Sequence, residues 1–142
     1  MPDDETRELL RKGRFLHGRG RVDDAIFMAR QALARDPDYV DALSYVGTTL
    51  VTRRLSYQEG LDLLERALEL APDDPGVNYS LGWCYEFVAY RLEKQATKPY
   101  RDPLDLYRLA AERLQRTIDL NPEQKLREDA EDLLTSVKER LE

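Results

Sequence analysis

Few side chains in this sequence could carry out catalysis or bind a metal ion. His17 is the one histidine and Cys84 the one cysteine, and they lie far apart in the chain. Metal sites need several such ligands at short spacings, and a nucleophilic Ser44 or Ser80 would need a base that only His17 could provide. No glycine-rich phosphate loop follows an expected strand. We therefore expect a protein that is not an enzyme, with no catalytic residue, no metal site and no cofactor.

The composition is that of one soluble domain with a heavily charged surface. The chain has 142 residues, of which 42% are hydrophobic and 35% are charged, and this is enough for one continuous core. The net charge of -6 argues against binding to nucleic acid or to an anionic membrane. We expect residues 1–142 to form a single domain.

Nothing in the sequence predicts secretion or membrane insertion. The first five residues are mostly acidic, whereas a signal peptide would be basic and then apolar. The most apolar segment, residues 81–90, is about half the length of a membrane span and contains Glu86. A single cysteine excludes an intramolecular disulfide and is compatible with a reducing compartment. We therefore expect a cytoplasmic protein without a membrane partner.

The charges are distributed unevenly along the chain. Residues 7–21 are basic apart from Glu8, whereas residues 59–76 are acidic apart from Arg66. In the basic segment, Arg7, Arg11 and Arg14 share one face of an expected helix because they are four and then three residues apart. These arginines could clamp acidic side chains or a C-terminal carboxylate, or they could form an ordinary solvated face.

Glycines and prolines recur at intervals that indicate an internal repeat. Gly13, Gly47 and Gly82 are about 35 residues apart, and each lies within an apolar pattern of helical period. Prolines at positions 37, 72 and 122 each follow a second helical pattern, which they are expected to end. A glycine inside a helix costs about 1 kcal/mol relative to alanine, so three in one register indicate close helix packing. At Gly47 we expect leucine to be costly and alanine to be much milder.

These features resemble the tetratricopeptide repeat family, in which each unit is a pair of antiparallel helices. The match covers residues 6–122, and one unit carries these family positions: Leu43, Val46, Gly47, Leu50, Gly60, Leu64, Ala67 and Pro72. The resemblance implies an all-α fold, an α-α superhelix or right-handed solenoid of three helix pairs. We place the repeats at about residues 6–39, 40–74 and 75–124.

The end of the chain departs from a plain series of repeats. The third unit contains an insertion near residues 91–106, and Asp102 and Pro103 predict the N-cap and the first residue of its returning helix. We therefore expect an elongated hairpin with a loop near residues 96–101, which is either neutral or a contact surface or dimerisation arm. An amphipathic helix at residues 123–142 is expected to cap the stack.

The resemblance also implies where a partner would bind. In this family the first helices of the units line a concave face, and the register assigns these residues to it: Arg7, Arg11, Arg14, Tyr45, Thr48, Tyr79, Trp83, Phe87 and Tyr90. The aromatic residues matter most because Trp and Tyr are enriched in binding hot spots. The alternative is that Trp83 and Phe87 are simply covered by the hairpin or by the terminal helix.

One specialised activity of the family is not expected here. Members that hold the acidic tails of chaperones use Lys and Asn in the first helix and Asn in the next. This chain has Leu10, Arg14 and Tyr45 at those positions, so that activity does not carry over.

Together these features predict an adaptor that binds a peptide or protein segment, acidic in character, in the concave groove. The alternative is a structural scaffold that self-assembles through charge-complementary surfaces or through the hairpin. On this alternative the protein would form a homo-oligomer. Binding of nucleic acid through the basic first helix is a third class, and the net charge argues against it.

Overall fold

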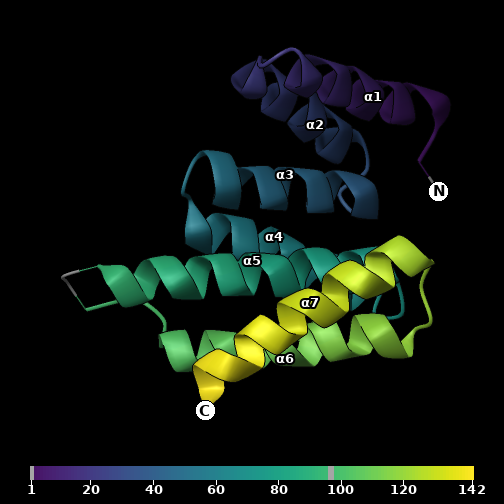
Figure 1. The fold of residues 1–142 in the computed structure, drawn as a ribbon. Helices are drawn as coiled ribbons and strands as arrows, with labels where there is room; N and C mark the ends of the chain where they lie inside the picture. Colours follow the sequence, from purple (N-terminus) through teal and green to yellow (C-terminus); the bar gives the residue numbers. More distant parts are fainter. Residues whose placement is uncertain (1, 96–97) are drawn as a thin grey trace. The chain divides into compact units, whose positions relative to one another are not determined.

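The computed structural model describes residues 2–95 and 98–142, and all regular secondary structure in these ranges is helical (Figure 1). The first half of the chain contains α1 (Asp4–Gly18), α2 (Val22–Arg35), α3 (Val40–Arg53) and α4 (Tyr57–Leu70). The second half contains α5 (Pro75–Lys94), α6 (Pro103–Asp119) and α7 (Gln124–Leu141). The predicted all-α class is therefore confirmed for the described residues.

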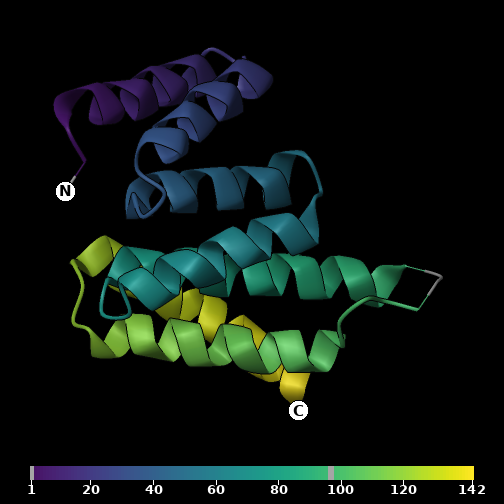
Figure 2. The same ribbon diagram turned by 180° about the vertical axis from the view of Figure 1, so that it is seen from behind.

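The helices divide into two compact units, Met1–Leu70 and Ala71–Glu142. Figure 2 shows the same helices from the opposite side. In the first unit, α1 pairs with α2 and α3 pairs with α4, and α2 also packs on α3. In the second unit, α5 pairs with α6, and α7 packs mainly on α6. Each unit therefore has helix contacts of its own, and the single domain expected over residues 1–142 stays a prediction.

The core of the first unit lies where α2 packs against α1 and α3. Ala29 and Ala32 of α2 are completely buried in an apolar cluster with Leu10 of α1 and Val46 of α3. Small side chains on α2 thus face larger ones on both neighbours, as close packing requires. This arrangement explains why the sequence places alanines, and not leucines, along the second helix of the first repeat.

Glycines bring the two helices of each hairpin into close contact. A Cβ atom on Gly47 of α3 would lie 2.8 Å from the carbonyl oxygen of Gly60 on α4, and one on Gly60 would lie 2.7 Å from the carbonyl oxygen of Gly47. The corresponding distance from Gly13 to the carbonyl oxygen of Ala25 is 3.0 Å. The interpretation of these residues as packing glycines is confirmed. Alanine at Gly47 would bring its methyl group against a backbone atom, so we expect the alanine variant to be costly as well. That alanine is much milder than leucine stays a prediction.

The second unit is built on the longest hairpin of the described chain. Helix α5 has 20 residues and α6 has 17, against 14 or 15 in each of the first four helices. Gly82 of α5 faces Leu114 of α6, and a Cβ atom on Gly82 would lie 3.0 Å from Cγ of Leu114. Asp102 accepts a hydrogen bond from the Leu104 N–H at 3.0 Å, and Pro103 opens α6 as predicted. Residues 96 and 97 of the expected loop lie outside the described residues.

Helix α7 covers one side of α6 with a single apolar stripe. Ala130, Leu134 and Val137 of this stripe are buried, and the exposed positions of the helix carry mostly charged side chains. An amphipathic helix is therefore present where the sequence predicted one. Its role as a cap stays a prediction.

A carboxylate and its partners hold the N-terminus of α1. Asp3 Oδ1 accepts hydrogen bonds from the Thr6 hydroxyl at 2.7 Å and from the Thr6 N–H at 2.8 Å. Asp3 Oδ2 accepts a third from Arg35 Nη2 at 3.0 Å. These bonds, the Thr6 hydroxyl first, lower the pKa of Asp3 from 3.8 to about 2. The start of α1 is thereby tied to the end of α2.

Gly47→Ala tests the backbone contact between α3 and α4. The added methyl group would push the two helices apart, so we expect the free energy of unfolding to fall by about 1–3 kcal/mol despite the better helix propensity of alanine. Gly18→Ala is the matched control, because nothing lies within 4 Å of a Cβ atom at that position. The control should be neutral or slightly stabilising in urea or thermal unfolding. Equal stability of the two variants would contradict the contact.

Asp3→Asn tests the electrostatic part of the α1 cap. Because the pKa of Asp3 is lower in the folded chain than in the unfolded chain, its ionised form stabilises the fold above about pH 4. That contribution is lost as the pH falls towards about 2. Asparagine still caps a helix but does not ionise, so the variant should lose less stability over this range. Urea unfolding as a function of pH measures this, and identical pH profiles for parent and variant would refute the assignment.

Candidate functional site

Tyr45 of α3 is the centre of the candidate surface on the first unit. Its hydroxyl is hydrogen-bonded to Nδ1 of His17 on α1 at 2.8 Å, and the two rings meet edge to face with centroids 5.6 Å apart. The guanidinium carbon of Arg14 lies 6.0 Å from the centroid of the Tyr45 ring. Burial raises the pKa of the Tyr45 hydroxyl, so this group is a neutral hydrogen-bonding group at physiological pH. These contacts join the first helices of two successive repeats.

The three predicted arginines of α1 differ in their partners. Arg7 and Arg11 are exposed, and they form ion pairs with Asp4 and Glu8, each three residues earlier on the same helix. Arg7 also donates a hydrogen bond to the carbonyl oxygen of residue 2 at 2.6 Å. Arg14 has no carboxylate within ion-pair distance in the described ranges and contacts the Tyr45 ring instead. Arg14 is therefore the cation most available to an acidic ligand.

Thr48 lies three residues after Tyr45, on the same side of α3, and is half-buried. Its carbonyl oxygen accepts a hydrogen bond from the hydroxyl of Thr52 at 2.9 Å. The neighbouring Ser44 hydroxyl is buried and has no hydrogen-bond partner among the residues that the structure describes. The half-buried side chains that follow Tyr45 on this helix therefore include the hydroxyl groups of Thr48 and Thr52.

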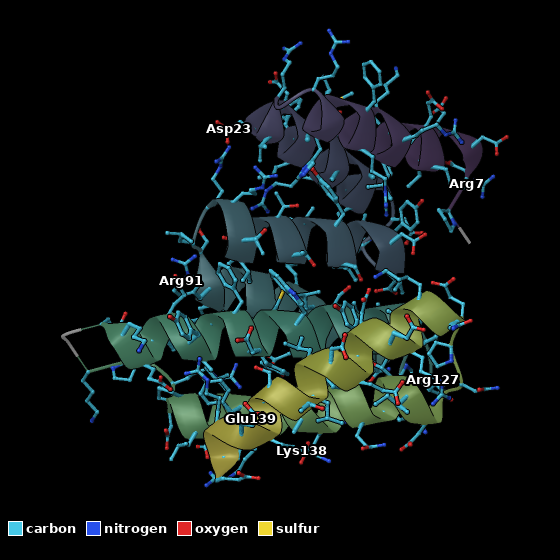
Figure 3. All side chains as sticks on the ribbon, viewed as in Figure 1. Arg7, Asp23, Arg91, Arg127, Lys138 and Glu139 are labelled. Atoms are coloured by element: carbon cyan, nitrogen blue, oxygen red, sulfur yellow. The ribbon has the colours of Figure 1, made fainter. Side chains whose placement is uncertain are left out.

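On the second unit, three side chains of α5 form a continuous stack. The rings of Trp83 and Phe87 lie nearly parallel, with centroids 5.4 Å apart and an interplanar angle of 21°. Arg91, which Figure 3 labels, continues the stack. Its guanidinium carbon lies 4.6 Å from the centroid of the Phe87 ring. Residues four apart share one helix face, so the stack is an apolar stripe with a cationic end. Trp83 and Phe87 are half-buried, so neither is fully covered by other elements.

Tyr90 and Tyr79 lie beside charged groups of the second unit. Tyr90 is 41% exposed, and the centroid of its ring lies 5.3 Å from Lys94 Nζ and 5.1 Å from the guanidinium carbon of Arg140. Arg140 belongs to α7 and also pairs with Glu93 of α5 at 3.2 Å. Burial raises the pKa of Tyr79, and a carboxylate on α7 raises it further. The residues of α7 thus border this edge of the candidate surface.

Glu86 places a carboxyl group on the side of α5 that also bears Trp83 and Tyr90. It follows Trp83 by three residues and precedes Tyr90 by four, so all three lie on adjoining faces of α5. The side chain is half-buried, and burial raises the pKa of its carboxyl group, whereas the charge of Arg140 lowers it. A hydrogen-bond donor from a ligand would stabilise the ionised form of Glu86.

The described residues lack the features of a metal site and of a membrane-spanning helix. They contain no cluster of three or more His, Cys, Asp or Glu side chains that could hold a metal ion. Over the same ranges, no helix combines the length and the apolar character needed to cross a bilayer. Cys84 is buried within α5, as expected for a packing residue.

Comparison with known proteins identifies a curated relative of part of the chain. A TPR repeat-containing protein of Pseudomonas aeruginosa is 40% identical over 67 residues, which is 47% of this chain and 11% of the relative. The chain thus spans about a tenth of the length of that relative. No family model matches the chain.

Solved structures are similar over almost the whole chain. The first TPR of Spaghetti, bound to an HSP90 peptide, has a TM-score of 0.76 at 15% identity, covering 98% of this chain and 95% of that one. The chaperone SycD of Yersinia enterocolitica, in complex with a peptide of the translocator YopD, has a TM-score of 0.74 at 13% identity, covering 99% and 97%. This chain has the tetratricopeptide repeat fold. The resemblance inferred from its repeated glycines and prolines is confirmed.

The TPR fold does not by itself bring all the predicted site residues together. Five of them lie on the first unit: Arg7, Arg11, Arg14, Tyr45 and Thr48. The others lie on the second unit: Tyr79, Trp83, Phe87 and Tyr90. Their joint action in one concave groove stays a prediction.

Two arginines beside the TPR aromatics were not predicted. Arg91 could have been found, because it follows Phe87 by four residues and a cation at that spacing reaches the ring. Arg140 is distant from Tyr90 in sequence, and its contact depends on how α7 packs. No local pattern in the sequence identifies it.

Tyr45→Phe tests the contact between α1 and α3 in the first two TPR hairpins. The change removes the hydrogen bond to His17, so the free energy of unfolding should fall by about 0.5–1.5 kcal/mol. Tyr57→Phe on α4 is the control, because the Tyr57 hydroxyl has no hydrogen bond among the described residues. Urea unfolding compares the two, and a Tyr45→Phe variant as stable as the control would show that the bond contributes nothing.

Proposed function

We propose that this chain is a non-catalytic interaction module that binds a peptide or protein segment on the first helices of its TPR hairpins. The observation that carries the proposal is the stack of Trp83, Phe87 and Arg91 on α5. Its two aromatic rings are large and only half-buried. Aromatic side chains in such positions bury much apolar area at little entropic cost when a partner binds.

The solved neighbours support this kind of ligand. The first TPR of Spaghetti binds an HSP90 peptide, and SycD is in complex with a peptide of YopD. At 15% and 13% identity these likenesses carry the fold alone, so the ligand of this chain is inferred from its own side chains. Because the chain spans about a tenth of its Pseudomonas aeruginosa relative, the activity and partners of that whole protein are not transferred.

The charges on the first unit favour an acidic partner. Arg14 lies beside Tyr45 without a competing carboxylate, so it is the best placed to pair with an acidic side chain. Arg7 and Arg11 are already paired within α1, so they act mainly by steering the encounter. Exposed ion pairs of this kind contribute little net energy, so carboxylates of a partner could replace Asp4 and Glu8 as the partners of these arginines.

The second unit would supply most of the affinity. Apolar side chains of the partner would pack on Trp83 and Phe87, while the guanidinium of Arg91 keeps N–H donors for peptide carbonyl oxygens. Glu86 would accept a hydrogen bond from an N–H group of the bound segment.

We further propose that the protein is a cytoplasmic adaptor. The contacts described above give no support to the scaffold alternative, and we do not propose it.

Peptides selected from a random display library against the immobilised chain test the function. We expect the selected sequences to combine apolar or aromatic residues with acidic ones. Trp83→Ala should weaken their binding by about 30-fold or more, chiefly through faster dissociation. Arg14→Glu should slow association, and its effect should shrink as salt rises above about 0.15 M. Surface plasmon resonance resolves both rates.

Tyr100→Ala is the control variant for this experiment. Tyr100 is an exposed aromatic residue of the third hairpin, outside the proposed surface, and its loss should leave binding unchanged. If binding survives Trp83→Ala and is abolished by Tyr100→Ala, the hairpin and not the first-helix surface is the binding face. If the library yields no binder, the chain is not a general peptide-binding module.

A further inference from the structure

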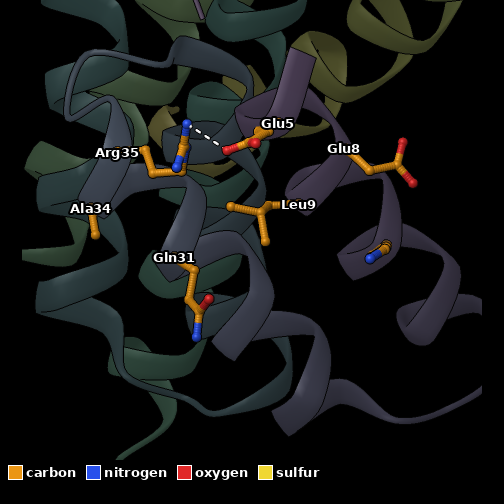
Figure 4. Close-up of a pocket in the computed structure, with 7 residues that line it drawn as sticks. Glu5, Glu8, Leu9, Gln31, Ala34 and Arg35 are labelled. Atoms are coloured by element: carbon orange, nitrogen blue, oxygen red, sulfur yellow. Dashed lines mark ion pairs between the residues drawn. The ribbon is translucent and has the colours of Figure 1, made fainter. Parts of the chain in front are cut away.

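A shallow groove runs along the outer side of the first hairpin. Its volume is about 530 Å³, and its walls include Glu5, Leu9 and Lys12 of α1 and Gln31, Ala34 and Arg35 of α2 (Figure 4). Leu9 points into the groove, and an ion pair of 2.9 Å between Arg35 and Glu5 closes one end. None of these residues belongs to the surface proposed above for peptides.

Two exposed aromatic side chains extend the walls of this groove. Phe15 is 66% exposed and follows Lys12 by three residues, and Phe27 is 60% exposed and precedes Gln31 by four. Residues at these spacings lie on one side of a helix, so both phenylalanines lie on the side that bears the groove. Arg19 lies next to Phe15, with its guanidinium carbon 5.9 Å from the centroid of the Phe15 ring.

On α3, the first helix of the second repeat, the face that corresponds to this side of α1 is buried. Gly13 and Gly47 make the same close approach to their second helices, so they align the two repeats. In that register, Lys12 and Phe15 correspond to Val46 and Thr49. Val46 is fully buried and Thr49 is 3% exposed, whereas Phe15 is the most exposed large apolar side chain described. The face that is covered on α3 is therefore open on α1.

Helix α2 packs on the Val46 side of α3, whereas α4 packs on the Gly47 side. Helix α2 places Ile26 and Ala29 in one cluster with Val46. Its first turn is acidic, and Asp23 accepts a hydrogen bond from Arg54, the residue that follows α3, at 2.5 Å. The cover of this face is thus a helix with a stripe of small and branched apolar residues and carboxylates at its start.

The open face of α1 is basic towards its C-terminal end, at Lys12 and Arg19, and acidic towards its N-terminal end, where Glu5 and Glu8 line the groove. The basic end complements the acidic first turn of such a helix. Lys12 and Arg19 have no carboxylate within ion-pair distance in the part of the chain that the structure describes. Arg19 corresponds in register to Arg53, the neighbour of the Arg54 that pairs with α2. A helix that docks on α1 as α2 docks on α3 would bring its first turn close to Arg19.

We propose that Lys12, Phe15 and Arg19 of α1, with Phe27 of α2, bind an amphipathic helix of a partner protein. The helix carries a stripe of small and branched apolar residues and carboxylates in its first turn. Its apolar stripe covers Phe15, and its carboxylates pair with Arg19 and Lys12. This second interaction surface does not depend on the peptide surface, because none of its residues is shared with that surface.

A helical peptide copied from α2 tests the proposal on the full chain. The probe contains residues 21–36, a fluorescein label, and a lactam bridge from Asp24 to a lysine introduced by Met28→Lys, which keeps it helical. Fluorescence anisotropy should show saturable binding below about 1 mM. Phe15→Ala should weaken this binding by at least about tenfold. Because Phe15 is exposed, circular dichroism should show that the variant keeps its helix content.

Matched variants separate this surface from the rest of the molecule. Leu104→Ala removes a similarly exposed apolar side chain from α6 and should leave probe binding unchanged. Arg19→Glu should weaken binding, and a probe carrying Asp23→Lys should recover part of the loss with that variant. Trp83→Ala should leave binding of the probe unchanged. The test of this surface is therefore independent of the test of the proposed function.

Three results would overturn the inference. One is absence of probe binding to the parent chain up to about 1 mM. Another is equal binding to the parent and to Phe15→Ala, which would place the probe elsewhere. The third is self-association of the parent in sedimentation velocity that Phe15→Ala abolishes, because the occupant of the face would then be a second copy of this chain.

Discussion

Contact between helices at glycine is the constraint on which each hairpin depends. No side chain separates Gly47 from Gly60, so α3 and α4 approach closely at one level, and that level decides which residues of the two helices face each other. With α3 fixed in rotation, Tyr45 faces α1 and its hydroxyl reaches His17. The position of a candidate binding residue is thus set by a pair of residues that a ligand need not touch.

Helix α1 supports two surfaces of different chemistry. One side carries Arg14 and His17 beside Tyr45, and this side belongs to the surface proposed for peptides. The other carries Lys12 and Phe15 along the outer groove. Residues one or two apart along a helix point in well-separated directions, so one helix can serve two partners without sharing a side chain. The basic charge of residues 7–21 is therefore divided between two faces.

The sequence sufficed for the features that depend on local patterns. The helical period around Gly47 and the pair Asp102 and Pro103 act within a few residues, so the helices and one N-cap were predictable. The pairing of Arg11 with Glu8 was also predictable, because the two residues are three apart on one helix and carry opposite charges. The contact of Arg140 with Tyr90 could not be predicted from the sequence, since it depends on how a helix distant in sequence packs.

The pattern of helix contacts has a consequence for how the chain folds. Within each unit, the strongest contacts join helices that follow one another directly in sequence, such as α1 with α2 and α5 with α6. Proteins with such low contact order fold quickly, because little loop entropy is lost before contacts form. During synthesis, the first hairpins can therefore close on the ribosome while α5 to α7 are still being translated. The chain would acquire its structure progressively, hairpin by hairpin.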